Sequence, residues 1–167
     1  MRDLNQVTVK QHYFNDDGRV PNHPSYPFVH YQAVFENEDS IEQILKENHW
    51  YNSWRGGIFD YHHYHSNAHE VLVVVEGEAT LQVGGVSGEQ LEVGVGDVLI
   101  LPAGTGHKFI DGSESFAVIG AYPEGVPYDL CTGDPAEKEK HIQKITEVPK
   151  PSHDPVFGEH GPLSTLW

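Results

Sequence analysis

The feature that most constrains the fold is a regular succession of short apolar segments and glycine or proline turns between residues 58 and 122. Segments of this length are typical of strands and too short for packed helices. Closely spaced strands joined by tight turns predict an all-β sandwich or barrel. We expect strands at 58–65, 70–76, 79–83, 89–93, 97–101, 107–110 and 115–122.

The flanking regions are less regular. A further strand is predicted at 28–35 and a short helix from Ser40 to about Asn48, with a second helical stretch at 135–144. A chain of 167 residues is long enough for one domain with its own core. We therefore expect a single domain over 1–167, described by three ranges: an irregular N-terminal arm and helix at 1–54, a barrel core at about 55–122, and a tail at 123–167 that is ordered only if it packs on the barrel.

Charge and apolar content exclude several classes of partner. The chain has 25 acidic and 10 basic residues, a formal charge of -15, which repels the backbone of nucleic acids and anionic membrane surfaces. Apolar stretches such as 71–75 are too short to span a bilayer, and the first residues lack the apolar core of a signal peptide. The lone Cys131 has no cysteine partner. We expect a cytoplasmic protein with neither nucleic-acid nor membrane partners.

Histidine is the anomaly of the composition. The chain has 12 histidines, and four of them fall within residues 62–69. A solvated surface cluster would explain such a tract, and so would a metal site, because neutral imidazole is the commonest ligand of transition metals.

The spacing of the histidines favours the metal site. Residues two apart on a strand point to the same face, so His63 and His65 would project together into the barrel, while His62 would project away. Glu70 shares a face of the next strand with Leu72, and His107 begins a strand at the same level. Three imidazoles and one carboxylate suit one divalent transition ion, namely Fe, Mn, Ni, Zn or Cu, and leave two positions of a six-coordinate ion open.

Two motifs carry a family resemblance. Gly57, His63, His65, Glu70 and Gly77 stand at the spacing of the first cupin motif, and Gly96, Pro102, Gly104 and His107 at that of the second. The chain thus resembles the cupin superfamily, which implies a jelly-roll (double-stranded β-helix) barrel. The stretches DYHHYHSNAHEVL, LILPAGTGHK, PNHPSYPFVHY and VPKPSHDPVFGEHGPL are similar to single-domain bacterial YjlB-like cupins. The resemblance also implies a homodimer, since cupins of this size commonly pair through their sheets.

Some assignments stay open. His69, in the loop before Glu70, is an alternative or additional ligand, and a barrel whose histidines hold no metal is the opposing interpretation. Phe59 and Tyr61 share the face of His63 and are expected to line the pocket with Leu72 and Phe109, although core packing would explain them equally well. No catalytic acid or base stands out.

The leading functional hypothesis is a metal-dependent enzyme acting on a small polar metabolite. Dioxygenase chemistry ranks first because three histidines and a glutamate recur in the cupin dioxygenases that the motif resembles. A non-redox isomerase or hydrolase of sugar-like compounds is the first alternative. A non-catalytic module that binds or senses a small molecule is the second, and a storage role ranks last.

Overall fold

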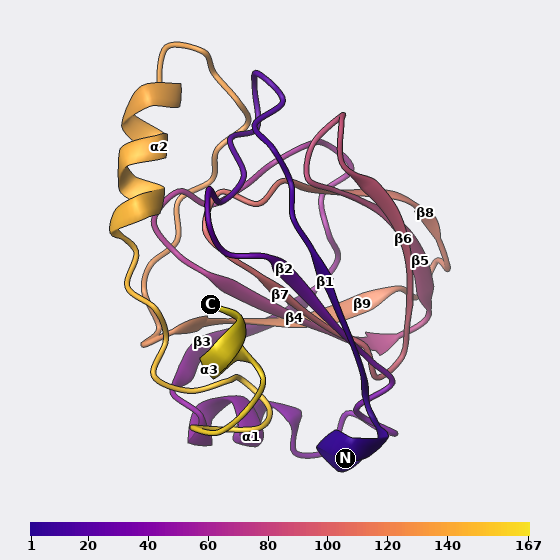
Figure 1. Ribbon diagram of the computed structural model, residues 1–167. Coiled ribbons are helices and arrows are strands. Elements are labelled where there is room, and N and C mark those ends of the chain that lie inside the picture. Colours follow the sequence, from indigo (N-terminus) through magenta and orange to yellow (C-terminus); the bar gives the residue numbers. More distant parts are fainter.

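The computed structural model describes residues 1–167 as two antiparallel sheets with three helices and one 3-10 turn (Figure 1). The large sheet has the strand order β1-β2-β7-β4-β9-β3 and the small sheet the order β6-β5-β8. The elements are the turn Leu4–Gln6, β1 Thr8–His12, β2 Phe28–Gln32, α1 Ile41–Glu47, β3 Trp50–Gly56, β4 Glu70–Glu76, β5 Glu78–Val83, β6 Glu89–Gly94, β7 Val98–Leu101, β8 His107–Gly112, β9 Ala117–Pro123, α2 Lys138–Glu147 and α3 Leu163–Leu166. The predicted all-β jelly-roll class is confirmed.

Strand β4 explains why the middle of the sequence is so apolar. Leu72 and Val74 face the small sheet and pack with Leu81 and Val83 of β5 in the core between the sheets. The alternate residues of β4, Val71 and Val73, belong to a second core on the outer face of the large sheet. Because both faces of β4 are buried, its apolar run is continuous rather than alternating.

The second core is covered by segments from both ends of the chain. Helix α1 contributes Ile41 and Leu45, and the C-terminal tail contributes Val156 and Leu163. Asp154 docks the tail: it is 1% exposed and accepts hydrogen bonds from the Tyr31 hydroxyl at 2.5 Å and from backbone amides of the tail at 2.9–3.2 Å. The tail is therefore packed on the sheet.

Several sequence-based boundaries differ from the structure. The strand predicted at 28–35 ends at Gln32, and β3 at Trp50–Gly56 is not among the predicted strands. Residues 8–12, expected to be irregular, form β1 and pair with β2. The strand predicted at 58–65 is wrong: regular pairing ends with β3 at Gly56, and the segment then has only isolated bridges, at His63 and Tyr64. The reason is topological, because this segment crosses from the edge of the large sheet to β8 of the small one. Helix α2 begins at Lys138 rather than at 135.

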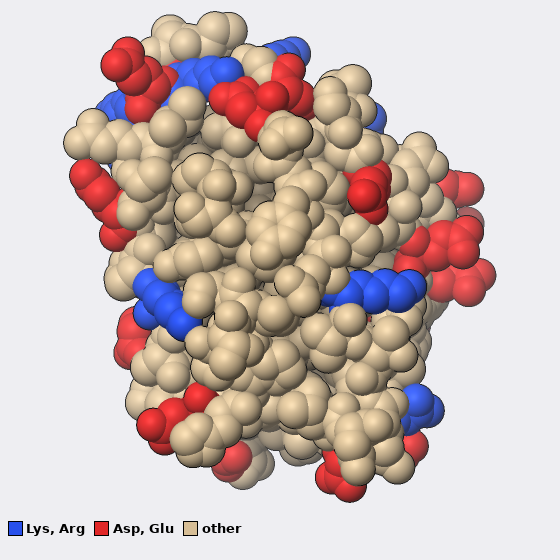
Figure 2. Space-filling model, in the orientation of Figure 1, with Lys and Arg blue, Asp and Glu red and all other residues tan.

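The surface reflects the charge balance of the sequence. On the face drawn in Figure 2, acidic side chains lie mainly along the rim and uncharged residues fill most of the middle. None of the helices has both the length and the apolar character needed to cross a bilayer.

Candidate metal centre

The predicted ligands meet between the two sheets, at the end where β4 and β8 begin. Glu70 is the first residue of β4 and His107 the first of β8. The crossing segment brings His63 alongside His107: the His107 amide donates to the His63 carbonyl at 2.9 Å, and the His63 amide donates back at 3.3 Å. His65 follows two residues later, and all four side chains are buried.

Three of the four side chains converge on one point. Glu70 Oε2 lies 3.3 Å from His65 Nε2 and 3.3 Å from His107 Nε2. Each residue offers one ligand atom, and these atoms all lie within 4.8 Å of one another. Such a group of two imidazole nitrogens and a carboxylate oxygen can hold a divalent transition ion.

His63 lies beside this group rather than in it. Its ring centroid is 4.0 Å from that of His107 and 6.1 Å from that of His65. The structure thus brings three of the predicted ligands together and places the fourth in contact with them.

The outer nitrogens of all three imidazoles are fixed by backbone carbonyls. His63 Nδ1 contacts the Tyr61 carbonyl oxygen at 3.0 Å, His107 Nδ1 that of Thr105 at 3.1 Å, and His65 Nδ1 that of Asp129. A carbonyl oxygen can only accept, so each Nδ1 must carry the proton. In the neutral ring each Nε2 then keeps a free lone pair, which is the form that binds metals.

The charges of the group are coupled. Burial alone would raise the pKa of Glu70, but attraction to His65 and His107 outweighs it and lowers the pKa well below its usual range. Burial alone would lower the pKa of His65, but the nearby Glu70 charge and the hydrogen bond of His65 to the Asp129 carbonyl raise it. The pKa of His63 is lowered to about 3 by burial and by its histidine neighbours. The Glu70 carboxylate is therefore ionised.

A buried hydrogen-bond chain, which the sequence did not reveal, orients that carboxylate. Tyr122 of β9 donates its hydroxyl hydrogen to Glu70 Oε1 at 2.9 Å, and Trp54 of β3 donates its indole hydrogen to the Tyr122 oxygen at 2.7 Å. The indole lies over Gly120, where a Cβ atom would stand 2.5 Å from the ring. Burial, and then the Glu70 charge, raise the pKa of Tyr122, so the phenol stays protonated. Only the pairing of β9 with β3 and β4 brings these residues together.

Aromatic side chains surround the group. Phe59 and Tyr61 stack on each other and meet the His63 ring edge-on, at centroid distances of 5.2 and 5.7 Å, and both are partly exposed. Tyr128, also partly exposed, stacks on Tyr122 at 4.3 Å and meets His65 at 5.0 Å. The other two predicted pocket residues, Leu72 and Phe109, belong to the core between the sheets.

His69 lies outside the group. It is fully buried and packs against the ring of Trp167, with the centroids 4.7 Å apart. Its Nδ1 accepts a hydrogen bond from the Ala103 amide at 2.9 Å, so in the neutral ring the proton is on Nε2. This is the opposite tautomer to that of the three histidines at the centre. Burial lowers the pKa of His69 to about 3.

Comparison with known proteins shows the family of the chain. A family model described as the cupin domain matches residues 52–119. The Bacillus subtilis (strain 168) protein called "Uncharacterized protein YjlB" is 45% identical over 159 residues, which cover 95% of this chain and 96% of that protein. The chain belongs to the cupin family. Within it, this cupin is a YjlB-like member, as its motifs predicted.

Solved structures show likeness at the level of the fold. An uncharacterized conserved protein with a double-stranded β-helix domain from Klebsiella pneumoniae is 14% identical, with a TM-score of 0.37, over 78% of this cupin and 89% of that chain. RmlC from Streptococcus suis in complex with dTDP-D-xylose is 12% identical, with a TM-score of 0.40, over 72% of each chain.

The surroundings of one Glu70 oxygen atom indicate whether the centre of this cupin can bind a metal ion. Glu70 Oε2 is buried and has no hydrogen bond, although two imidazole nitrogens lie 3.3 Å away. A buried carboxylate oxygen without a partner is costly. An ion placed among Oε2 and the two Nε2 atoms would satisfy it, so the residues fit the metal that cupins often bind.

Proposed function

We propose that this cupin is a metal-dependent enzyme that acts on a small polar metabolite. One divalent transition ion, Fe, Mn, Ni, Zn or Cu, would be held by His65, Glu70 and His107, with the neighbouring His63 as the fourth ligand. The observation that carries the proposal is the common tautomer of the three imidazoles around an ionised, unpartnered carboxylate oxygen. His69 is not in the proposed ligand set, because its Nδ1 is already bonded to Ala103.

The bound ion would supply Lewis-acid or oxygen-activating chemistry, and we place dioxygenase-type oxidation first. The protein's own residues prepare the centre. Tyr122 holds one oxygen of Glu70 so that the other faces the imidazoles. The ring of Tyr128 covers the Tyr122 side and the rings of Phe59 and Tyr61 cover the His63 side, which limits the access of water.

Metal content tests the first part of the proposal. Protein prepared without a histidine tag should carry about one ion per chain after dialysis, and His65→Ala or His107→Ala should each remove most of it. The matched control is His160→Ala, because His160 is exposed and distant from the centre in sequence. If the double variant of His65 and His107 keeps the wild-type metal content, the ions lie elsewhere and the proposal is wrong.

Reactivity tests the second part. Iron-loaded protein prepared without oxygen should bind nitric oxide and give a paramagnetic signal, because four protein ligands leave open positions on a six-coordinate ion. Small thiols, diketones, phenolic acids and sugar acids can then be screened in an oxygen electrode. Oxygen uptake that depends on one of them and is lost in His107→Ala supports the dioxygenase. Turnover of a sugar-like compound by Zn- or Mn-loaded protein without oxygen uptake would replace it with a non-redox isomerase or hydrolase. Binding without turnover under any metal would leave a sensing module.

We also propose that this cupin works in the cytoplasm as a homodimer and has no nucleic-acid or membrane partner. The formal charge of -15 and the lone, buried Cys131 support this environment. Cell fractionation checks the location, and the mass of the particle in solution checks the dimer.

A further inference from the structure

A second polar cavity lies on the far side of the backbone that carries His63 and His107. Its volume is about 370 Å³, within the range of small-molecule sites. Its walls include His62 and Lys108, the chain neighbours of His63 and His107, whose side chains point the other way. Another wall is formed by Val86 and by the clasp, which we define as residues 15–20. Tyr61, whose ring meets His63, also lines the cavity, so the cavity adjoins the candidate metal centre but contains none of its predicted ligands.

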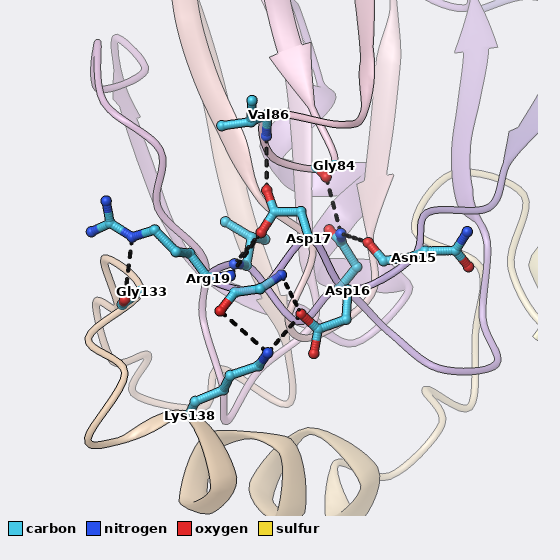
Figure 3. A network of polar contacts seen from close by, with 11 residues as sticks. Asn15, Asp16, Asp17, Arg19, Gly84, Val86, Gly133 and Lys138 are labelled. Atoms are coloured by element: carbon cyan, nitrogen blue, oxygen red, sulfur yellow. Dashed lines mark hydrogen bonds and ion pairs between the residues drawn. The ribbon is translucent and has the colours of Figure 1, made fainter.

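The clasp is held rigidly against the small sheet (Figure 3). Asp17 accepts hydrogen bonds from the Arg19 and Val20 amides at 2.9 and 2.7 Å with one oxygen, and from the Val86 amide at 2.9 Å with the other. Lys138 of α2 forms an ion pair with Asp16 at 2.8 Å. These contacts anchor the clasp on both sides, so the cavity is formed before any molecule enters it.

Two cationic side chains of the cavity have no acidic partner. Arg19 makes one side-chain hydrogen bond, from Nε to the Gly133 carbonyl at 3.5 Å, and its terminal nitrogens form no ion pair. Lys108 forms neither a hydrogen bond nor an ion pair with its side chain. In a chain with 25 acidic and 10 basic residues, two unpaired cations in one cavity are an unusual concentration of positive charge.

A third group of the cavity has an unsatisfied atom. His62 Nδ1 is buried and has no hydrogen-bond partner. A buried polar atom without a hydrogen-bond partner lowers the stability of the folded protein, and a bound ligand could supply that partner. Together the guanidinium, the ammonium and this ring nitrogen line one cavity, and none of the three is hydrogen-bonded to a carboxylate.

Two carboxylates, Asp17 and Asp60, also line the cavity, but neither forms an ion pair with Arg19 or Lys108. Both oxygens of Asp17 are occupied by the backbone amides of the clasp and of Val86. Asp60, the other acidic residue, is exposed and forms no ion pair with Arg19 or Lys108.

We propose that this cavity binds a small molecule through a phosphate or carboxylate group, held by Arg19, Lys108 and His62. A guanidinium offers paired N–H groups that match two oxygens of either anion, and an ammonium adds a point charge. The site is independent of the metal, since none of its three groups belongs to the proposed ligand set.

Binding of inorganic anions tests the site on the full-length protein. Orthophosphate and malonate are titrated at constant ionic strength, and binding is followed by calorimetry and by the NMR shifts of the Lys108 and Val86 amides. At least one of them should bind saturably below about 10 mM. Preference for orthophosphate indicates a phosphate ester as the natural ligand, and preference for malonate a carboxylic acid.

Charge variants decide whether the named residues hold the anion. Arg19→Gln and Lys108→Gln should each weaken binding about tenfold or more, and Asp60→Asn should strengthen it by removing a repelling charge. The matched control is Lys46→Gln, which lowers the net charge equally at an exposed, unpaired lysine of α1. The Lys108 side chain forms no hydrogen bond or ion pair within the protein, so we expect Lys108→Gln to keep the fold. No saturable binding of either anion, or an equal loss in Lys46→Gln, would overturn the proposal.

Discussion

The position of one proton divides the four buried histidines on or beside the candidate ligand segments into two kinds. His63, His65 and His107 donate from Nδ1 to backbone carbonyls, whereas His69 accepts at Nδ1 from an amide. When neutral, the first kind presents a free Nε2 lone pair toward the centre, and the second does not. The tautomer thus ranks Glu70 above its neighbour His69 as the ligand from this part of the chain.

Separate substitutions of Glu70 and His69 test this assignment. Glu70→Gln keeps the shape but removes the charge, so we expect metal affinity to fall by about tenfold or more. His69→Gln should keep the metal, although it should lower stability by about 2 kcal/mol because the ring is fully buried. Metal content per folded chain is the measurement. Loss of metal in His69→Gln with retention in Glu70→Gln would exchange the two roles.

Tyr122 should act through Glu70 rather than on a substrate. Tyr122→Phe removes the hydrogen bond to Glu70 Oε1 and leaves the Trp54 indole without its acceptor. We expect metal affinity to fall about 10- to 100-fold, as for other groups that orient a ligand. Tyr128→Phe is the control, since the Tyr128 hydroxyl forms no hydrogen bond and its ring would still stack on Tyr122. Equal affinities in the two variants would refute the positioning role.

Metal binding should depend on pH through His65. The raised pKa of His65 means that the metal-free protein holds a proton on this ring at pH values where an ordinary histidine has lost it. The ion must displace that proton, so affinity should rise with pH between about 5 and 8. His63, with its pKa lowered to about 3, adds no proton in this window. Calorimetry in two buffers of different ionisation enthalpy counts the protons released, and a constant affinity would contradict the scheme.

Sequence spacing predicted which residues gather at the centre but not what holds them. His65, Glu70 and His107 could be named because two short motifs fix their places on neighbouring strands. Tyr122 and Trp54 could not, because they meet Glu70 only through the pairing of β9 with its neighbours. A tyrosine in an apolar strand is equally typical of ordinary core packing.

At the scale of elements, the alternating pattern predicted a strand that does not form where the chain changes sheets. The segment 58–65 has the residue types of a strand, and the parity argument placed His63 and His65 correctly on the inner side. Yet the segment leaves β3 and joins β8 through only a few backbone contacts. The residue pattern of a segment indicates only that its backbone is extended. A β-strand also needs a neighbouring strand paired with it in register. The strands from β4 to β9 have such partners, and their predicted positions agree with the structure within two residues.

The C-terminal tail depends on one carboxylate. Asp154 accepts four hydrogen bonds, from the Tyr31 hydroxyl and three tail amides, in a fully buried place. Asp154→Ala leaves these donors unsatisfied, so we expect the free energy of unfolding to fall by about 3 kcal/mol. Denaturant unfolding measures this loss, and limited proteolysis should cut the tail first. Asp39→Ala, at an exposed carboxylate without contacts, is the control; equal effects of the two changes would show that Asp154 does not anchor the tail.

At the scale of the whole molecule, the surfaces left for self-association are limited. Helix α1 and the tail already cover the outer face of the large sheet. The edges β1, β3 and β6 remain, because β8, the fourth edge, is bridged by His63, and strand edges present unpaired backbone groups. A homodimer would therefore use an edge or the outer face of the small sheet.

Charge sets how such a dimer should respond to salt. Each copy carries a formal charge of -15, so two copies repel each other, and screening weakens this repulsion. We expect light scattering to give twice the chain mass of 18.7 kDa, with a dissociation constant that decreases as salt rises from about 0.05 to 0.5 M. An uncharged osmolyte at matched osmolality is the control for solvent effects, because it leaves the repulsion unscreened. A mass of one chain at every protein and salt concentration would mean that this cupin is a monomer and that each metal centre works without a partner subunit.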